Sequence, residues 1–358
     1  MAITNGNGRA RTLPKRAPGL ATLEEVARVA GVSRATVSRV VNDSPRVSPD
    51  VRQAVERAIE SLGYVPNRAA RSLVTRRSDS VAVVITEPTG RLFSDPFFPR
   101  LLRGISAELA GRDRQLVLVM PESAADERRA AAYLSAGHVD GVLLTSLHGD
   151  DALPRELLAR GVPVVVGGRP IHGEQVSYVD VDNRAGGREA VAHLAARGRR
   201  TIATIAGPHD MAVGIDRLAG YRDGLTAAGL AADPGLVAEA DFTHDGGARA
   251  MRSLLDARPD LDAVFAASDA MAAGALSELL AAGRRVPEDV AVVGYDDSPI
   301  AAATRPPLTS VRQPIEEMGR EMARLLVESI GRGERAIRRV VLATELVTRA
   351  STEVKARH

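Results

Sequence analysis

The feature of this sequence that most constrains its fold is a series of short aliphatic runs, separated by amphipathic segments, over residues 79–358. Near-continuous apolar runs of about four to six residues are typical of strands buried on both faces, which occur in parallel sheets covered by helices. The runs are VAVVIT (81–86), QLVLVMP (115–121), DGVLLTS (140–146), VPVVVGG (162–168), RTIATIAGP (200–208), DAVFAASD (262–269) and DVAVVGYDD (289–297). The alternation of strands and helices predicts two doubly wound α/β lobes with parallel sheets.

Residues 21–66 follow a helical pattern instead. Thr22 and Glu25 form the T-x-x-E pattern of a capping box, so a helix is expected to begin directly after Thr22. Gly31 breaks the helical spacing and permits a tight turn, after which Ser33 is placed to cap a second helix. Two short helices joined by a turn around glycine predict an all-α helix-turn-helix unit.

The second helix would present short polar groups and two long hydrogen-bond donors on its outer face, namely Arg34, Ala35, Thr36, Ser38 and Arg39. Small side chains permit close approach to the major groove of DNA, and an arginine can donate to O6 and N7 of guanine. A third helix is expected with Ser48 as its cap and Pro49 at its first position, and it should stop at Gly63. The alternative interpretation is a three-helix bundle without a role in DNA binding.

The charge distribution separates the front of the chain from the rest. Residues 1–80 contain 14 basic and 7 acidic side chains, a net charge of +7, whereas the remaining residues have a net charge of −5. A cationic front segment on an anionic body indicates that only the front binds a polyanion, unless the charge serves solubility alone. Residues 1–20 are basic and lack an apolar stretch, so we expect a disordered tail rather than a secretory signal.

The segments LEEVARVAGVSRATVSRVVN (23–42) and RVSPDVRQAVERAIESLGYVPNRAARSL (46–73) closely resemble the DNA-binding headpiece of the LacI/GalR, or lactose-repressor, family. The resemblance implies a headpiece over residues 21–66 and a hinge helix with its linker over residues 67–78. In that family, paired hinge helices from two subunits enter the minor groove, and a leucine wedges into the central base step. The residues that the resemblance and the helix pattern place at the DNA are Thr22, Ser33, Arg34, Ala35, Thr36, Ser38, Arg39, Asn42, Asn67, Arg68 and Leu73.

The segment NRAARSLVTRRS (67–78) suits this role on physical grounds. Leu73 stands among four arginines, and a helix of about ten residues is too short to be stable alone. The arginines would bind phosphates, and the leucine wedge would offset an unstacking cost on the order of a few kcal/mol. The alternative is that Leu73 packs against the adjacent domain.

In doubly wound sheets, ligands bind at the carboxyl ends of the strands. The side chains that follow the expected strands include carboxylates, guanidinium groups and aromatic rings. This set is typical of a carbohydrate cleft, because planar polar groups bind pairs of hydroxyls and rings stack on sugar C–H faces. The side chains are Phe97, Phe98, Ser146, His148, Arg169, Arg217, Phe242, Asp269 and Asp296. The alternatives are that Arg217 and Asp269 are internal ion partners, that Phe98 belongs to the core and that His148 is an ordinary loop residue.

The resemblance to the lactose-repressor family extends over nearly all of residues 21–350. It implies a two-lobed effector-binding and dimerisation domain over residues 79–358, with a fold similar to that of periplasmic sugar-binding proteins. By motif, Arg217 in IDRLAGY and Asp296 in GYDD match the family's effector arginine and carboxylate. Gln313 in SVRQP matches a glutamine that sugar-responsive members use.

The loops indicate which kind of effector is bound. Phe97, Phe98 and Phe242 match aromatic pocket positions of the purine-responsive relative, but Met211 and Val213 stand where that relative has polar contacts. The loop segments LLTSLHGDD, VVVGGRP, EQVSYVDVDN, GPHDM and DFTHD resemble the cellobiose-responsive branch of the family. The resemblance therefore favours a β-glucoside or a cello-oligosaccharide.

The resemblance also implies how the parts act together. A homodimer would bind a palindromic operator and repress transcription, and a carbohydrate in the cleft would change the angle between the lobes and release the operator. No heptad repeat follows VVLATELVTRAST (340–352), so a dimer is expected rather than the tetramer of the lactose repressor. The alternatives are a family member that responds to a different small ligand, or one that acts with a corepressor.

Other function classes lack their signatures. The sequence has no cysteine, no G-x-G-x-x-G after the first expected strand, no P-loop and no G-x-S-x-G elbow, and its seven histidines show no metal-binding spacing. We therefore expect neither an enzyme nor a bound cofactor or metal. A solute-binding receptor would share the two lobes but not the helix-turn-helix segment. No apolar run has the length of a membrane span, and a cytoplasmic location is expected.

Replacing Leu73 by alanine should weaken operator binding by roughly tenfold or more and leave effector affinity unchanged, because a wedge that offsets base unstacking is lost. Fluorescence anisotropy with operator DNA and calorimetry with effector measure the two affinities. An unchanged operator affinity would contradict the wedge.

Overall fold

The computed structural model describes residues 21–42, 44–65, 77–173, 175–332 and 336–353. Contacts divide the chain into two units, which we call the headpiece (Met1–Arg77) and the body (Ser78–His358). The expected tail and most of the expected hinge lie outside the described residues, and with them the predicted DNA contacts Asn67, Arg68 and Leu73.

The described part of the headpiece contains the helices α1 (Leu23–Ala30), α2 (Arg34–Val41) and α3 (Pro49–Leu62). The predicted capping box is confirmed, because the backbone N–H of Glu25 donates to Thr22 Oγ1 (3.2 Å) and that of Thr22 donates to Glu25 Oε2 (2.7 Å). These bonds satisfy two N–H groups that a helix start leaves without partners.

The turn between α1 and α2 and the headpiece core also follow from the sequence. Gly31 has a φ of 67°, the left-handed conformation that glycine adopts at low cost, and Ser33 caps α2. The expected cap at Ser48 is wrong in detail, since its side chain makes no hydrogen bond to α3. The core of the headpiece is aliphatic, with Val26, Val37 and Val55 fully buried.

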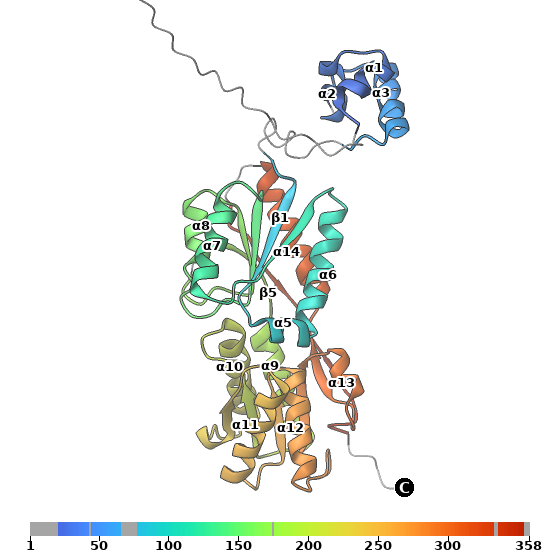
Figure 1. The fold of residues 1–358 in the computed structure, drawn as a ribbon. Helices are drawn as coiled ribbons and strands as arrows, with labels where there is room; N and C mark the ends of the chain where they lie inside the picture. The colour runs from blue at the N-terminus through green and yellow to red at the C-terminus, as the bar shows by residue number, and fades with distance from the viewer. Residues whose placement is uncertain (1–20, 43, 66–76, 174, 333–335, 354–358) are drawn as a thin grey trace, which may run out of the picture. The chain divides into compact units, whose positions relative to one another are not determined.

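The body consists of two lobes, each built around a six-stranded sheet (Figure 1). In the N-lobe the strand order is β11-β5-β4-β3-β1-β2, and all neighbouring strands are parallel. These strands are β1 (Ser80–Ile85), β2 (Gln115–Val119), β3 (Gly141–Thr145), β4 (Val164–Gly167), β5 (Ser177–Val181) and β11 (Arg339–Leu342). Helices α6 (Phe97–Ala110) and α14 (Ile315–Arg332) pack on one face, and α7 (Ala124–Ser135) and α8 (Leu153–Ala159) pack on the other.

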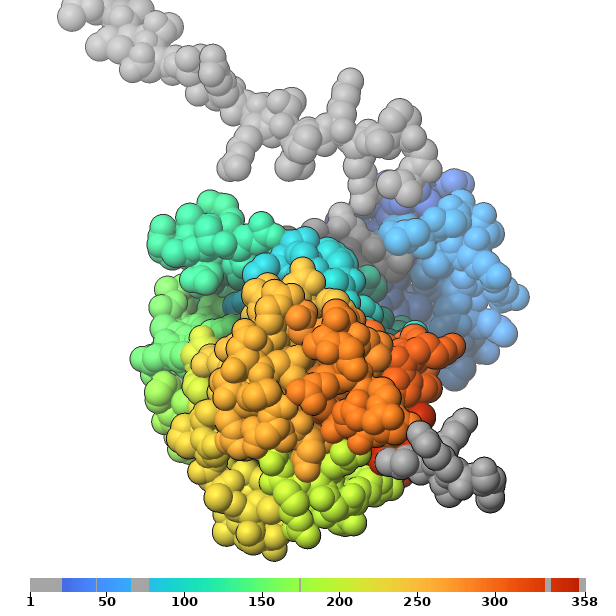
Figure 2. Space-filling view, turned by 90° about the horizontal axis from the view of Figure 1, so that it is seen from below, coloured from blue at the N-terminus to red at the C-terminus, as the bar shows by residue number. Residues whose placement is uncertain are grey.

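The C-lobe sheet has the order β12-β10-β9-β8-β6-β7 and is parallel except for β12, which pairs antiparallel with β10. Its strands are β6 (Ile202–Ala206), β7 (Val237–Glu239), β8 (Ala263–Ala266), β9 (Ala291–Asp296), β10 (Thr309–Arg312) and β12 (Glu345–Val347). Helices α9 (Asn183–Ala196) and α10 (Ala212–Ala227) cover one face, and α11 (His244–Ala257) and α12 (Asp269–Ala281) cover the other. Figure 2 views this lobe from its outer end, in yellow-green to orange.

Three shorter helices complete the body: α5 (Thr89–Ser94), α13 (Pro299–Ala303) and the 3₁₀ turn η1 (Pro234–Leu236). In the described part of the chain, the backbone passes between the lobes three times: after β5, after β10 and after β11. The first and third of these crossing segments touch, since the backbone N–H of Asp182 donates to the carbonyl of Leu342 (2.9 Å). Gln313 stands on the second.

The two-lobed architecture expected from the aliphatic runs is confirmed, and each run overlaps a strand of the structure. Five strands lie outside these runs: β5, β7, β10, β11 and β12. Two of them show different reasons for this. In β10, Thr309 and Ser310 are buried but form hydrogen bonds, and in the edge strand β11, Val341 is 56% exposed. Burial of β10 therefore does not depend on an apolar run.

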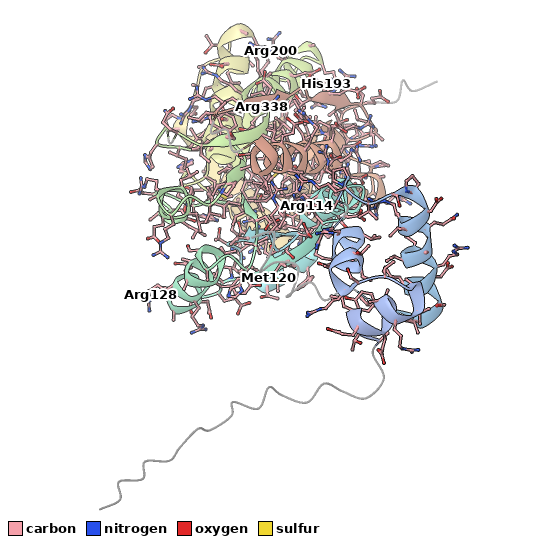
Figure 3. The ribbon with its side chains drawn as sticks, turned by 90° about the horizontal axis from the view of Figure 1, so that it is seen from above. Arg114, Met120, Arg128, His193, Arg200 and Arg338 are labelled. Carbon is pink, nitrogen blue, oxygen red and sulfur yellow. The ribbon has the colours of Figure 1, made fainter. Side chains whose placement is uncertain are left out.

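Asp140, immediately before β3, fixes the start of the body. Its carboxylate accepts hydrogen bonds from the backbone N–H groups of Ser78 (2.6 Å) and Asp79 (3.1 Å) and from Ser78 Oγ (2.9 Å). It also forms a 2.8 Å ion pair with Arg114, which is labelled in Figure 3, and the two side chains are only 7% and 10% exposed. One nearly buried carboxylate therefore ties the first residues of the body to the N-lobe sheet.

Replacing Asp140 by alanine should lower the free energy of unfolding of the body by about 3–5 kcal/mol, because Arg114 loses its partner in a nearly buried site. Urea denaturation of the full chain, followed by circular dichroism, measures the change. Glu127→Ala, which removes an exposed carboxylate from α7, is the matched control and should change stability by less than about 0.5 kcal/mol. Equal effects of the two substitutions would contradict the role given to Asp140.

Candidate functional sites

The headpiece presents the predicted DNA-reading face on α2. Arg34, Ala35 and Arg39 are exposed, and Thr36 and Ser38 are half-buried. Arg34 forms an ion pair with Glu24 (3.0 Å) in which both side chains are more than half exposed. Exposed ion pairs contribute little free energy, so Arg34 can exchange this partner for a phosphate or a base edge.

Three further predicted DNA contacts form local hydrogen bonds at the ends of these helices. Thr22 belongs to the capping box of α1, and Ser33 Oγ accepts from the backbone N–H of Thr36 (3.1 Å). At the other end of α2, Asn42 Nδ2 donates to the carbonyl of Ser38 (2.8 Å). These contacts fix the geometry of the helix-turn-helix unit from within the headpiece.

The body contains a cleft between its lobes, with an empty volume of about 1040 Å³ that includes the mouth. Eight of the predicted effector residues line it: Phe97, Phe98, Ser146, Arg169, Arg217, Phe242, Asp296 and Gln313. They come from both lobes and from one crossing segment, as expected for residues that follow parallel strands. The other two, His148 and Asp269, are each adjacent in the chain to a residue that lines the cleft, but they do not line it themselves.

Arg217, on α10, is fixed in the cleft by several contacts with the protein. It is 4% exposed, and its Nε donates to Asn183 Oδ1 (2.9 Å) while one Nη donates to the carbonyl of Ala267 (2.6 Å). Its guanidinium carbon lies 3.6 Å from the ring centre of Tyr295, a cation–π contact. A planar cation fixed on several sides is suited to donate to two neighbouring hydroxyls of a ligand.

Asp296 faces Arg217 from the end of β9. Its Oδ1 lies 3.5 Å from Arg217 Nη1 and accepts a hydrogen bond from Gln313 Nε2 (2.5 Å). Burial raises the pKa of Asp296 above its ordinary value, and the charge of Arg217 opposes that effect. The backbone φ of Asp296 is 106°, a strained value for a residue other than glycine, and such strain is concentrated at functional sites.

The aromatic walls of the cleft come from opposite lobes. Phe97 and Phe98 form an edge-to-face pair with ring centres 5.3 Å apart, and Phe98 is also part of the N-lobe core. Phe242 belongs to the C-lobe core, where Gly207 lies beneath its ring. A Cβ at position 207 would come within 2.2 Å of that ring, so glycine is required for Phe242 to keep its place.

Sequence analysis missed four charged residues of the cleft: Arg91, Asp95, Asp151 and Asp180. Asp95 accepts from the backbone N–H of Phe97 (2.9 Å), and Asp180 from that of Arg169 (2.9 Å). Burial raises the pKa of both carboxyl groups. Asp95 stands two residues before Phe97, which sequence analysis did assign to the cleft, so its position was a usable signal. Asp180 and Arg91 stand on β5 and α5, two elements that the aliphatic runs did not reveal.

The other two predicted residues are engaged within the protein. Asp269 is 1% exposed and accepts from the backbone N–H of Ser298 (2.7 Å) and from Ser310 Oγ (2.6 Å). Burial raises the pKa of Asp269. The ring of His148 lies between two carboxylates, those of Glu87 and Asp210. The structure thus places both residues in internal polar contacts.

The charges of the cleft favour a neutral polar ligand. The charged side chains that line it are Arg91, Arg169, Arg217, Asp95, Asp151, Asp180 and Asp296. Each of the three guanidinium groups has a carboxylate within ion-pair distance, so the cleft has no excess positive charge with which to bind a phosphate group. Paired guanidinium and carboxylate groups beside aromatic rings match the hydroxyls and C–H faces of a sugar.

Comparison with known protein families gives a match within each unit. Residues 22–67 match the family described as "Bacterial regulatory proteins, lacI family". Residues 191–352 match the "Periplasmic binding protein-like domain".

Characterised relatives cover nearly the whole chain. The chain is 57% identical over 332 residues to the HTH-type transcriptional regulator CelR of Thermobifida fusca, a match that covers 92% of this chain and 98% of that protein. It is 34% identical to the ribose operon repressor of Halalkalibacterium halodurans, with coverage of 93% and 98%.

Solved structures resemble the fold over a similar extent. The complex of the transcriptional regulator CelR with cellobiose matches with a TM-score of 0.75 and 55% identity, and the match covers 92% of this chain and 99% of that one. The lac repressor dimer bound to operator and the anti-inducer ONPF matches with a TM-score of 0.82 and 29% identity, with coverage of 94% and 100%. Among the described residues, no helix combines the length and apolarity needed to span a membrane.

Proposed function

Because the chain belongs to the lacI family of bacterial regulatory proteins, we propose that it is a transcriptional repressor controlled by a small carbohydrate. The proposed effector is a β-glucoside or cello-oligosaccharide, of which cellobiose is the simplest member. The observation that carries the proposal is the 57% identity to the CelR regulator, because it extends over both units and because a CelR structure holds cellobiose.

The proposed DNA complex contains two copies of the chain on a palindromic operator, the arrangement for which the lac repressor dimer with its operator is the precedent. Each copy reads one half-site with the exposed face of α2, where Arg34 and Arg39 donate to bases or phosphates and Ala35 permits close approach. The segment that contains Leu73 would occupy the minor groove at the centre of the operator.

In the proposed effector complex, one sugar lies between the two lobes. Arg217, Asp296 and Gln313 bind its hydroxyl groups from the C-lobe side, where they already contact one another. Phe98 and Phe242 contact its apolar C–H faces from opposite lobes. Since the ligand touches both lobes, its binding energy differs between the open and the closed arrangement, which is the condition for it to shift that equilibrium.

The proposed response to the effector is release of the operator. A coupling free energy of about 1–3 kcal/mol between the two sites would change operator affinity by roughly 5–150-fold. As a regulator of this kind, the protein acts on chromosomal DNA, so we place it in the cytoplasm and assign it no catalytic activity.

Arg39→Ala should weaken binding to the operator more than binding to unrelated DNA, because an arginine that contacts guanine contributes about 1–3 kcal/mol of base discrimination. The measurement is the ratio of the two dissociation constants at one salt concentration. Arg57→Ala on the exposed side of α3 is the matched control for the loss of one positive charge. Equal losses on both DNAs would contradict base reading by Arg39.

The proposed function is tested by adding cellobiose to the full chain bound to operator DNA and following release by fluorescence anisotropy. Ribose is the comparison sugar, since a ribose operon repressor is also a relative. We expect cellobiose and not ribose to release the wild-type protein. Failure of cellobiose at millimolar concentration would exclude it as the effector.

Arg217→Ala should retain operator binding and lose the response to cellobiose, because the guanidinium that binds sugar hydroxyls is absent while the headpiece is unchanged. Calorimetry with cellobiose should show a loss of affinity of at least about tenfold, as expected for a charged hydrogen-bond donor. Full sugar affinity in this variant would contradict the assignment of the cleft.

A further inference from the structure

His148 connects the two lobes through its imidazole ring. The residue follows β3 of the N-lobe, and its Nε2 lies 3.1 Å from Oε1 of Glu87, which follows β1 of the same lobe. Its Nδ1 lies 2.9 Å from Oδ2 of Asp210, which follows β6 of the C-lobe. Beside the ring, the backbone N–H of Gly149 donates to the carbonyl of Asp210 (2.7 Å).

The chemistry of these two contacts requires a proton. An ionised carboxylate only accepts hydrogen bonds, and a neutral imidazole has one N–H donor, whereas a protonated imidazole has two. A neutral His148 therefore donates to only one of the two carboxylates and presents a lone pair to the other. Only the imidazolium form satisfies both contacts.

Glu87 is held in the ionised form that this argument needs. Its side chain is 3% exposed, and Oε1 also accepts hydrogen bonds from Arg91 Nη1 (2.5 Å) and from Ser146 Oγ. Burial works to raise the pKa of Glu87, but its bonds with His148, Arg91 and Ser146 hold that pKa below the ordinary value.

The charged groups that face the ring are Glu87 and Asp210. Arg91 shares Oε1 of Glu87 with the ring. On the flanking loops, Asp150 pairs with Arg155 (2.8 Å) and His209 pairs with Glu239 (3.3 Å).

A second contact between the lobes starts from the same carboxylate. Arg91, which is bound to Glu87, places its guanidinium carbon 5.0 Å from the ring centre of Phe242 in the C-lobe. Arg91, Ser146 and Phe242 also line the cleft. Glu87 thus links the residues that bridge the lobes to residues that a ligand in the cleft touches.

We propose that protonated His148 is a bridge that favours the closed arrangement of the lobes, and that binding of the effector is coupled to uptake of a proton at this residue. The bridge itself follows from the geometry above, whereas its coupling to a sugar rests on the proposed function.

The direction of the pH dependence follows from the partners. The hydrogen bond with Glu87 and that with Asp210 raise the pKa of His148 above its ordinary value of 6.5, and burial opposes them. Separation of the lobes removes Asp210 and lowers that pKa. The closed arrangement is therefore favoured fully at pH values below the pKa that His148 has when the lobes are apart, and this advantage is lost as the pH rises through its higher pKa in the closed arrangement.

The test is calorimetry of cellobiose binding to the full chain from about pH 6 to about pH 9, in buffers with different heats of ionisation, which reports the protons taken up. For the wild-type protein we expect affinity to fall by about tenfold across this range, with proton uptake on binding in its upper part. His148→Gln should bind more weakly at low pH and lose both the pH dependence and the proton uptake. His209→Gln, a histidine paired only within the C-lobe, is the matched control and should behave as the wild type.

Asp210→Asn distinguishes a bridge from a direct sugar contact. An asparagine amide can donate to the unprotonated nitrogen of His148, so the bridge no longer needs a proton. We expect this variant to keep its affinity at high pH and to show a flattened pH profile. If His148→Gln or Asp210→Asn retained the wild-type profile, the proton-dependent bridge would be refuted.

If cellobiose bound at no pH, the proposed effector would be wrong, and the bridge would be judged without ligand. Nuclear magnetic resonance of the full chain with labelled histidine gives the pKa of His148 directly. A raised pKa that returns toward the ordinary value in Asp210→Asn supports the bridge. An ordinary pKa in the wild-type protein, or one unaffected by Asp210→Asn, rejects it.

Discussion

The direction of the strands decides where the body of this protein can bind a ligand. Nearly all strand pairs in the two sheets are parallel, so within each lobe the strands end at one edge, and the residues that follow them line a common cleft. Ser146, Arg217 and Asp296 are far apart in the sequence but are brought to the same volume in this way. A chain with this topology concentrates its polar side chains without a dedicated binding loop.

The chemistry of the cleft depends on how buried charges are neutralised. Removing a guanidinium group from water is costly unless its hydrogen bonds and its charge are compensated. Arg217 meets both requirements through Asn183, the carbonyl of Ala267 and the nearby Asp296. Because these partners belong to the protein, the C-lobe wall is organised before a ligand arrives, and the ligand does not have to order it.

The sequence was sufficient to predict the two-lobed architecture, the helix-turn-helix unit and most of the cleft. Those predictions rest on local signals: aliphatic runs for the strands, the Thr22–Glu25 capping box for α1, and the position after a strand for Arg217 and Asp296. The strands β5 and β10 were not predicted, because their buried residues include polar side chains that form hydrogen bonds. Such burial depends on partners distant in sequence, which composition and periodicity do not reveal.

Partners distant in sequence also explain why His148 and Asp269, which were predicted to bind the effector, contact other parts of the protein instead. Nothing in the neighbourhood of His148 along the chain indicates that its ring lies between Glu87 and Asp210, which are 61 and 62 residues away. Asp269 follows a strand as a ligand-binding residue would, yet Ser298 and Ser310 occupy its carboxylate. A polar residue at a strand end can therefore bind either a ligand or another part of the protein. Only the three-dimensional arrangement determines which of the two it binds.

The three segments that join the lobes have a mechanical consequence. When one lobe rotates relative to the other about the connecting segments, each atom is displaced in proportion to its distance from the rotation axis. Gln313 stands on a connecting segment, so the distance between its side chain and that of Asp296 changes little when the lobes separate. A small molecule that first binds beside Gln313 keeps this contact while the lobes move. Protein groups farther from the connecting segments contact it only when the lobes are fully closed.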